Sequence, residues 1–253
     1  MGAARGFGVD IGGSGIKGCV VDLDGGKLEG ERIRIPTPTP STPEAVSEVV
    51  ASIVKDFGWT GPVGVTLPSV VKRGVAHSAA NIDKSWIGTD AAALFAGRLG
   101  LPADQVTVLN DADAAGIAEV RYGQPHDQTG VVVLLTFGTG IGSALFLDGK
   151  LIPNTEFGHL EIDGHDAETR AAASAKEEED LSWEQWAKRV TRYVHGLENL
   201  IWPDLIIAGG GVSKKADKWL PLLDVRTKVV AAELRNDAGI VGAAVAAAAG
   251  ANP

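Results

Sequence analysis

Two segments of the chain are variants of one glycine-rich pattern, and this repeat constrains the fold more than any other feature. The first reads Asp10-Ile-Gly-Gly-Ser-Gly-Ile-Lys-Gly18, and the second reads Thr136-Phe-Gly-Thr-Gly-Ile-Gly-Ser143. In each, an apolar strand leads into a glycine turn, a second apolar strand leaves it, and the next turn ends in Gly-Lys-Leu. We therefore expect two similar half-domains that face each other, with one glycine hairpin from each lining the cleft between them.

Turns of this kind suit a chain of phosphates. Glycine lets backbone N–H groups come close to a ligand, and consecutive N–H groups form a concave site for anions. The familiar phosphate loops run from a strand through a turn into a helix, whereas residues 18–22 and 143–147 have no helical period. An ordinary hairpin turn is the alternative for either segment alone, and the recurrence of the pattern argues against it.

Size and charge limit the class of protein. With 253 residues, the chain can form one large domain or two small ones. The single cysteine, Cys19, excludes an internal disulfide and fits a reducing cytoplasm. Residues 1–6 lack the apolar core of a signal peptide, and the apolar run at 243–249 is too short to span a bilayer. The net charge of −9 works against nucleic acid or an anionic membrane as a partner.

The first half of the chain reads as strands and helices in the order βββαβα. Thr42 is the expected N-cap of the first helix, with Pro43 at its first position. The predicted elements are strands at 7–11, 18–23 and 28–35, a helix through Phe57, a strand at 63–67 with a hairpin to 79, a helix at 90–99 and a strand at 106–109.

The second half begins with a helix and repeats a glycine hairpin. The small and acidic residues 164–180 predict either a mobile excursion or a short solvated helix. The other predicted elements are a helix at 112–121, an amphipathic helix at 182–200, strands at 204–208 and 229–232, and a closing Ala-rich helix at 238–249.

Polar residues follow the strand at 106–109, where α/β folds bind their ligands. Asp111 is a candidate acceptor for the proton of an attacking hydroxyl group. The alternative is that Asp111 serves only as the N-cap of the next helix. Asn81, in a polar loop beside Trp86, is a weaker candidate for a sugar site, because Asn is common in loops for other reasons.

Two further segments of the second half could bind a ligand. Glu156, His159 and Glu161 bring two carboxylates and an imidazole into six residues, which could hold several sugar hydroxyls or a metal, or belong to an ordinary surface loop. A metal is disfavoured because only His165 follows at a suitable spacing. The sequence Gly209-Gly-Gly211 lies between a buried strand and a helical start, so it could place backbone under an anionic ligand or form a plain turn.

Taken together, these motifs resemble the ROK family of sugar kinases and repressors, which belongs to the actin/hexokinase/Hsp70 superfamily. The resemblance runs in order over nearly the whole chain, through residues 10–17, 109–111, 136–142, 156–159 and 208–211. More narrowly, residues 135–144 and 176–186 resemble the polyphosphate glucokinases of actinobacterial type.

The resemblance implies a duplicated α/β fold of the actin-like, hexokinase (ribonuclease H-like) kind, with two domains around a cleft. Residues 1–110 and the closing helix 238–253 would form a small domain, and residues 111–237 a larger one. The implied activity is phosphoryl transfer from polyphosphate, ATP or both to the 6-hydroxyl of glucose, in a cytoplasmic homodimer that binds neither nucleic acid nor membrane.

Three alternatives remain open at this point. The first is a strictly ATP-dependent glucokinase or glucomannokinase of the same family. The second is a sugar-sensing repressor, which would need a DNA-binding module, although the first strand already begins near Phe7. The third is another ATPase or small-acid kinase of the superfamily, which would not need the polyhydroxyl grip of residues 156–161.

The resemblance also implies a role for individual residues. Asp111 would be the base, and Asp10 would lie near Mg²⁺, through water. No structural zinc is expected, because many relatives carry a three-cysteine zinc motif after the Glu-x-Gly-His segment and this chain has only Cys19. The sugar hydroxyls would be held by Asn81, Asn110, Asp111, Glu156, His159 and Glu161. The donor would be held by Asp10, Gly12, Gly13, Ser14, Lys17, Thr136, Gly138, Thr139 and Gly140, with Gly210 and Gly211 on the adenosine side.

A long polyanion needs cations gathered locally on an acidic protein. Lys17 is expected in the first glycine turn itself, and two further clusters could form a track for polyphosphate. The alternative is that both clusters are solvated helix faces, as Lys and Arg usually are. The clusters are Lys188, Arg189 and Arg192, and Lys214, Lys215 and Lys218.

Overall fold

The computed structural model describes residues 4–123 and 129–251 of the chain. The chain folds into two compact units. Unit 1 comprises Met1–Ala118 and Asp237–Pro253, and unit 2 comprises Glu119–Asn236. The division falls inside helix α3 (Asp111–Tyr122), whereas the sequence placed a domain boundary at the start of this helix.

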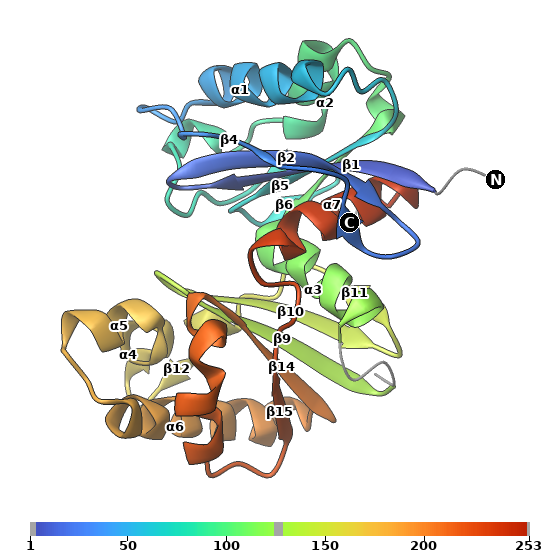
Figure 1. The fold of residues 1–253 in the computed structure, drawn as a ribbon. Helices are drawn as coiled ribbons and strands as arrows, with labels where there is room; N and C mark the ends of the chain where they lie inside the picture. The colour runs from blue at the N-terminus through green and yellow to red at the C-terminus, as the bar shows by residue number, and fades with distance from the viewer. Residues whose placement is uncertain (1–3, 124–128, 252–253) are drawn as a thin grey trace. The chain divides into compact units, whose positions relative to one another are not determined.

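Unit 1 is built on a mixed sheet with the strand order β3-β2-β1-β5-β8, and β4 also pairs with β2 (Figure 1). The β1–β2 pair is antiparallel, whereas β1, β5 and β8 run parallel. The strands are β1 (Arg5–Gly12), β2 (Gly15–Asp22), β3 (Lys27–Leu28), β4 (Ile33–Ile35), β5 (Val63–Leu67) and β8 (Val106–Asn110).

The sheet of unit 2 repeats this arrangement. Its order is β11-β10-β9-β14-β15, with β9–β10 and β10–β11 antiparallel and β9, β14 and β15 parallel. The prediction of a duplicated α/β fold is therefore confirmed at the level of strand order and direction. The strands are β9 (Val131–Phe137), β10 (Ile141–Leu147), β11 (Lys150–Ile152), β14 (Leu205–Gly210) and β15 (Lys228–Ala231).

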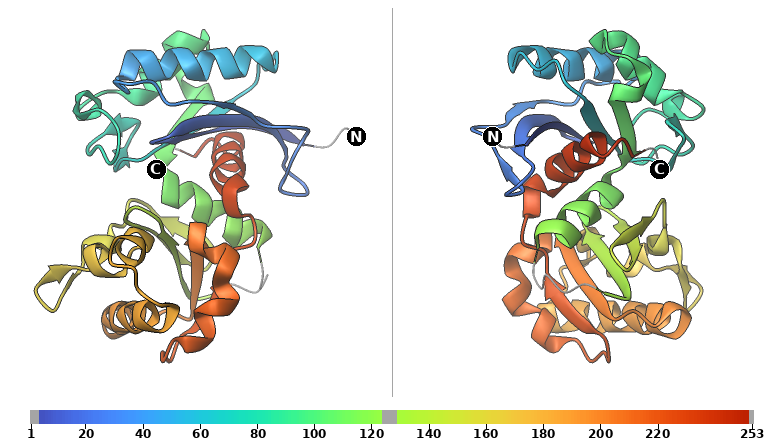
Figure 2. Two further views of the ribbon diagram at one scale, coloured as in Figure 1. Left: turned by 60° about the vertical axis from the view of Figure 1, so that its left-hand side comes forward. Right: turned by 90° about the vertical axis from the view of Figure 1, so that its right-hand side faces the viewer.

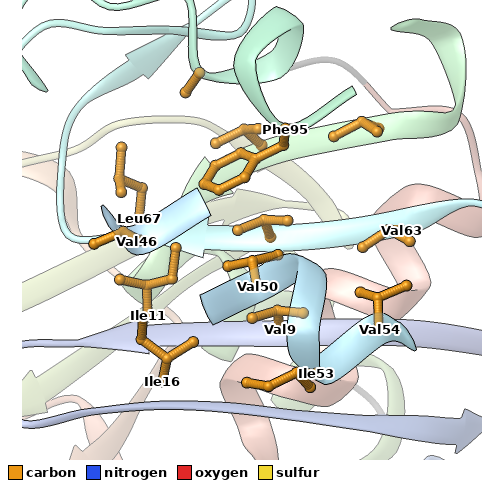
Figure 3. Packing of buried hydrophobic residues seen from close by; sticks show 14 of the residues in the cluster. Val9, Ile11, Ile16, Val46, Val50, Ile53, Val54, Val63, Leu67 and Phe95 are labelled. Carbon is orange, nitrogen blue, oxygen red and sulfur yellow. The ribbon is translucent and has the colours of Figure 1, made fainter. Parts of the chain in front are cut away.

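The two faces of the unit 1 sheet are covered differently. Helices α1 (Pro43–Asp56) and α2 (Ala91–Leu99) lie on one face, and α7 (Ala238–Ala248) lies on the other (Figure 2). Successive strand residues point to opposite faces, so Val9 and Ile11 join the apolar cluster under α1 and α2 (Figure 3). As predicted, the Thr42 side chain caps α1 by accepting a hydrogen bond from the backbone N–H of Ala45.

The face under α7 is lined by glycine. A Cβ atom on Gly8 would overlap the carbonyl group of Ile240, and one on Gly64 would overlap that of Ala243. The backbone of α7 therefore lies directly on the sheet, which only small residues permit. Asp10 shares this face with Gly8, and its carboxyl group packs against Gly239 in the first turn of α7.

The core of unit 2 forms under helix α6 (Trp183–Ile201), whose N-terminus has a capping box of Ser182 and Gln185. The Trp186 indole N–H donates to the carbonyls of Ala171 and Ala172, at 3.0 and 3.1 Å. Residues 164–180 are therefore a packed segment and not a mobile excursion, because their alanines are buried, most of them in the core cluster of Trp186. Only the acidic end, residues 177–180, is exposed as expected for a solvated helix. They contain β13 (His165–Asp166), α4 (Glu168–Ala171) and α5 (Ala173–Glu178).

One other prediction was wrong in detail. The strand expected over 28–35 is divided into β3 and β4: both pair antiparallel with β2, but the register changes between them, so residues 29–32 belong to neither strand. The residues after Gly210 form a 3₁₀ helix, η4 (Gly211–Lys218), with non-helical dihedral angles at Lys215. The remaining short elements are β6 (Val71–Lys72), β7 (Val75–Ala76), β12 (Glu161–Ile162), η1 (Lys84–Trp86), η2 (Ala103–Gln105), η3 (Phe157–His159), η5 (Leu220–Leu222) and η6 (Arg235–Asp237).

Within residues 4–123 and 129–251, no helix has the length and hydropathy that crossing a membrane requires.

Candidate functional site

The first glycine hairpin closes with a two-residue turn. Gly12 pairs with Gly15, so Gly13 and Ser14 form the turn. Lys17 therefore lies in β2, directly opposite Asp10, and not in the turn where the sequence placed it.

Side chains occupy two carbonyl oxygens at this turn. The Thr37 hydroxyl donates to the carbonyl of the flanking Gly12 at 2.5 Å, and the Arg34 guanidinium donates to the Ser14 carbonyl at 3.0 Å. Within the described residues, no hydrogen bond uses the backbone N–H groups of Gly13 and Ser14. These two N–H groups can therefore donate to an anion.

Arg34 was missed by the sequence analysis. It lies in β4 opposite Lys17, and its exposed guanidinium group rests against Gly15. The sequence places Arg34 in the strand that follows the hairpin. The expected strand at 28–35 did not predict which residue of β2 would pair with Arg34. Arg34 and Lys17 give the first hairpin two cationic side chains.

Asp10 is held by hydrogen bonds on both carboxylate oxygens. The Thr66 hydroxyl donates to Oδ1 at 3.0 Å and itself accepts from the backbone N–H of Ile11 at 3.2 Å. The Lys17 ammonium group lies 3.1 Å from Oδ2. Thr66 is fully buried, so the orientation of the Asp10 carboxylate is fixed by a residue that solvent does not reach.

Asn81 lies beside the same turn. A Cβ atom on Gly13 would lie 3.4 Å from both the Cβ atom and the carbonyl oxygen of Asn81. Asn81 has a φ of +59° and an exposed side chain. The structure therefore brings this candidate sugar residue next to the first glycine turn, a relation that the sequence did not predict.

Asn110 and Asp111 follow β8 at the carboxyl edge of the parallel strands. Asn110 Oδ1 accepts from the backbone N–H groups of Ala112 and Asp113, at 2.8 and 3.2 Å, and its amide donates to the Ser69 carbonyl at 3.1 Å. Asn110 is therefore the cap of α3, and the alternative that Asp111 is only the N-cap is wrong. The Asp111 side chain is exposed in the first turn of the helix, where one oxygen accepts from Ala112 N–H at 2.9 Å.

The second glycine hairpin closes with a three-residue turn. Phe137 pairs with Ile141, so the turn is 138–140, and Thr136 lies in β9 opposite Gly142. Ser174 of α5 occupies two of its carbonyls: its backbone N–H donates to Gly138 at 3.1 Å and its hydroxyl to Thr139 at 2.7 Å. Within the described residues, the backbone N–H groups of Thr139 and Gly140 have no hydrogen-bond acceptor.

The candidate sugar residues of unit 2 form a cluster that includes an unpredicted member, Glu168. One Glu168 oxygen accepts from the Ile141 backbone N–H at 3.0 Å, and the other lies 3.8 Å from Nδ1 of His159. That imidazole nitrogen is also 3.3 Å from the Asp166 carboxylate. Glu168 escaped prediction because residues 164–180 were expected to be solvated.

Burial raises the pKa of Glu156, although part of its side chain is exposed. His159 opposes this shift in pKa, and the negative charge of Glu168 adds to it. Glu161 lies in β12 opposite Asp166, with an exposed side chain. Among the described residues, no ion pair or hydrogen bond joins the Glu161 side chain to Glu156 or His159.

Gly210 and Gly211 lie at the end of β14, beside the second hairpin. The parallel register pairs Gly209 with Thr136 and Gly210 with Phe137. The exposed side chains of Lys214, Lys215 and Lys218 follow on η4.

The two arginines of the other candidate cation cluster have carboxylate partners. Arg189 donates to both oxygens of Glu179, at 2.8 and 2.6 Å, and Arg192 donates to both oxygens of Asp163, at 3.0 and 2.6 Å. Lys188 is exposed on the same helix.

With this geometry in view, comparison with known proteins identifies the family. The ROK family model matches residues 6–173. The chain belongs to the ROK family. A polyphosphate glucokinase of Mycobacterium tuberculosis is 62% identical over 245 residues, which cover 97% of this chain and 92% of that protein. The glucokinase of Streptomyces coelicolor is 28% identical over 94% of this chain and 96% of its own length.

Solved structures of ROK proteins have the same fold as this chain. The inorganic polyphosphate/ATP-glucomannokinase of Arthrobacter sp. strain KM superimposes with a TM-score of 0.91 at 55% identity, covering 97% of this chain and 99% of that one. A ROK glucokinase of Streptomyces griseus, in complex with glucose and AMPPNP, gives a TM-score of 0.81 at 25% identity, covering 96% of this chain and 98% of that one. The expected actin-like, hexokinase fold is confirmed.

The first hairpin of this ROK chain carries a carboxylate that a hard cation could use. Among the described residues, no three His, Cys, Asp or Glu side chains are grouped so that they could hold a metal. Mg²⁺ is usually held by one or two carboxylates together with substrate phosphates. Asp10 is such a carboxylate and lies at the first hairpin. When bound, the metal would neutralise charge on the phosphate oxygens.

Proposed function

We propose that this chain transfers a phosphoryl group from inorganic polyphosphate to the 6-hydroxyl of glucose and also accepts ATP. The observation that carries the proposal is the 62% identity to a polyphosphate glucokinase over 97% of the chain. The two glycine turns support it, because both present backbone N–H groups that have no acceptor among the described residues. We also propose that the protein is cytoplasmic and a homodimer, that it requires Mg²⁺ and that it contains no zinc.

In this proposal Asp111 is the general base. Its carboxylate takes the proton of the 6-hydroxyl as that oxygen forms a bond to the terminal phosphorus, and the shortened polyphosphate leaves. Asn110 caps α3 through its amide oxygen, which fixes the start of the helix where Asp111 lies. One amide N–H of Asn110 donates to Ser69, and the other is available to the sugar. Glu156 and His159 hold other hydroxyl groups, and we add Glu168 to them on the strength of its contact with His159. Asn81 and Glu161 remain proposed sugar residues.

The donor is assigned to the two hairpins and the end of β14. Gly12, Gly13, Ser14 and Lys17 act from unit 1, together with Asp10 through the metal. The residues proposed for the donor in unit 2 are Thr136, Gly138, Thr139, Gly140, Gly210 and Gly211. Within the proposed polyphosphate track, the side chains without an ion-pair partner among the described residues are Lys188, Lys214, Lys215 and Lys218.

A strictly ATP-dependent glucokinase is the second candidate, since the Streptomyces griseus relative was solved with AMPPNP. Purified protein is offered glucose or mannose with either polyphosphate or ATP, and the 6-phosphate product is measured directly. The Asp111→Asn variant, prepared in the same way, controls for contaminating host kinases. Turnover with polyphosphate supports the proposal, turnover with ATP alone supports the second candidate, and turnover with neither donor contradicts both.

A further inference from the structure

A cavity of about 360 Å³ lies in unit 2, at the face of α6 that is lined by β12, β13 and α4. We call it the α6 pocket. None of its lining residues belongs to either glycine hairpin or to the sugar-binding cluster. Its charged and polar lining consists of Asp163, His165, Arg170, Lys188, Arg189 and Arg192, and Ile162, Ala167, Ala171 and Tyr193 provide apolar surface.

The α6 pocket has an excess of positive charge, although the protein is acidic. Four Arg and Lys side chains and one Asp line it, and Glu179, outside the lining, pairs with one of the arginines, while the whole chain carries a net charge of −9. Such a local excess of positive charge attracts anions and raises their concentration near the surface.

Two of its cations are held in fixed positions by carboxylates. The bidentate pairs Arg189–Glu179 and Arg192–Asp163 orient both guanidinium planes. Salt and water screen ion pairs at the protein surface, so an anion with several charges can compete for the same donors.

The other two cations differ from these in their partners. Among the described residues, no ion pair involves Arg170 or Lys188. Instead, Arg170 lies 3.2 Å from Nε2 of His165. A guanidinium group can only donate, so Arg170 donates to this nitrogen of His165. This bond uses one of the five N–H groups of Arg170 and leaves the others for a ligand.

From this arrangement we infer that the α6 pocket is a second binding site for inorganic polyphosphate, which holds phosphates of the chain that are not being transferred. The inference rests on the proposed function for the identity of the polyanion. A linear phosphate chain suits the pocket because it offers several anionic groups in a row to cations from two segments, α4 and α6. A short donor has too few phosphates to occupy both the transfer site and a second site.

The test compares two double variants with the same change of charge in the same unit. Arg170→Ala/Lys188→Ala removes the two cations of the pocket that lack an ion pair within the described residues, and Lys150→Ala/Lys228→Ala removes two exposed cations elsewhere. Calorimetry measures binding of long-chain polyphosphate and of tripolyphosphate, without glucose, at several salt concentrations. Kinetics then give KM for long-chain polyphosphate, tripolyphosphate and ATP.

The pocket variant should bind long chains about tenfold more weakly than the wild type, since tenfold corresponds to about 1.4 kcal/mol. The slope of log K against log salt should fall by roughly 1.4, at about 0.7 for each lost contact with a single strand. The ratio of the KM for long chains to that for tripolyphosphate should rise, and the control variant should change neither quantity.

Equal effects of the two double variants on long-chain binding would overturn the inference, because they would reflect net charge alone. An equal loss for tripolyphosphate and long chains would also overturn it, because the residues would then act at a single site. If Arg170→Ala lowers the melting temperature, Lys188→Glu alone gives the same readouts from an exposed side chain. Absence of polyphosphate turnover in the wild type contradicts the proposed function, whereas the binding experiment still tests the pocket.

Discussion

The two glycine hairpins have the same place in their sheets, but they differ in what they present. The first has a two-residue turn and a charged cross-strand pair, Asp10–Lys17, next to it. The second has a three-residue turn, and the sequence position of Asp10 is occupied by Thr136, which faces Gly142. Both hairpins therefore present backbone N–H groups, but only the first has a charged pair beside its turn.

The carbonyls of the two turns are also occupied in different ways. In the first hairpin two side chains do so, and one of them is the guanidinium of Arg34. In the second, one uncharged residue, Ser174, donates through both its backbone and its hydroxyl. In the proposed function, the charged contacts to the donor would therefore come from the first hairpin, and the second turn would contribute backbone N–H groups.

The largest expected effect tests whether unit 1 also carries the reacting base. Asp111→Asn should lower kcat by roughly 10²–10⁴-fold, the usual contribution of a positioned general base. KM for glucose should change much less, because the amide can still bind the hydroxyl group. Steady-state kinetics with saturating donor measure both, and Asp104→Asn, at an exposed position of η2, is the control. If the variant keeps more than about a third of wild-type kcat, a base in this position is excluded.

The next effect concerns the negative charge of the sugar cluster in unit 2. The accepting form of Glu156 is the carboxylate, and its pKa is raised by burial. Glucose affinity should therefore fall with decreasing pH, beginning above the ordinary glutamate pKa of 4.5. Glu156→Gln should raise the glucose KM by about 10–100-fold, since a hydrogen bond to a charged group contributes roughly 1.5–3 kcal/mol.

Glucose KM measured across pH at constant ionic strength separates this role from a structural one. The Glu156→Gln variant should lose the acid-side rise in KM, while donor KM stays near the wild-type value. A variant with the same pH profile as the wild type would remove Glu156 from the sugar site.

Both hairpins and most helices could be predicted from the sequence because their signals are local. Thr42 and Pro43 mark the start of α1, and Ser182 with Gln185 marks that of α6. The residues that the sequence did not predict share one property: their positions depend on pairing between segments far apart in the sequence. Arg34 reaches the first turn only through the register of β4 on β2.

Tertiary packing also explains the unpredicted part of the sugar cluster. Residues 164–180 look solvated by composition, yet Trp186 binds the carbonyls of Ala171 and Ala172 and fixes the segment. That packing carries Glu168 to the Ile141 backbone and to His159. No local signal distinguishes this glutamate from the exposed ones that follow it.

A smaller effect tests whether the second turn contacts the phosphates through its backbone N–H groups alone. A Cβ atom on Gly138 would meet no atom within 4 Å, whereas one on Gly140 would overlap the Glu168 carboxylate. Gly138→Ala should therefore leave the melting temperature unchanged and raise donor KM about tenfold, or about 1.4 kcal/mol, because the methyl group blocks the approach of phosphate. Gly140→Ala should lower the melting temperature and raise glucose KM, since it displaces Glu168. If donor KM does not respond to Gly138→Ala, the second turn does not contact phosphate.

The smallest expected effect separates the two ways of occupying turn carbonyls. Arg34→Ala removes a hydrogen bond and a positive charge from the first hairpin, whereas Ser174→Ala removes only the hydroxyl bond to Thr139 and leaves the backbone bond to Gly138. Arg34 is exposed, so its attraction for the donor is screened by salt within about 10 Å at 0.1 M. Arg34→Ala should then raise donor KM several-fold at low salt and less at high salt, roughly as for an exposed charge pair worth up to about 1 kcal/mol. Ser174→Ala should shift donor KM by a smaller factor that salt does not change, and Arg34→Lys should retain most of the salt-dependent part of the effect.

Donor KM is measured for all three variants over a series of salt concentrations. If the effects of both alanine variants are independent of salt, Arg34 only stabilises the shape of the turn. The difference in charge between the two hairpins would then consist of the Asp10–Lys17 pair alone.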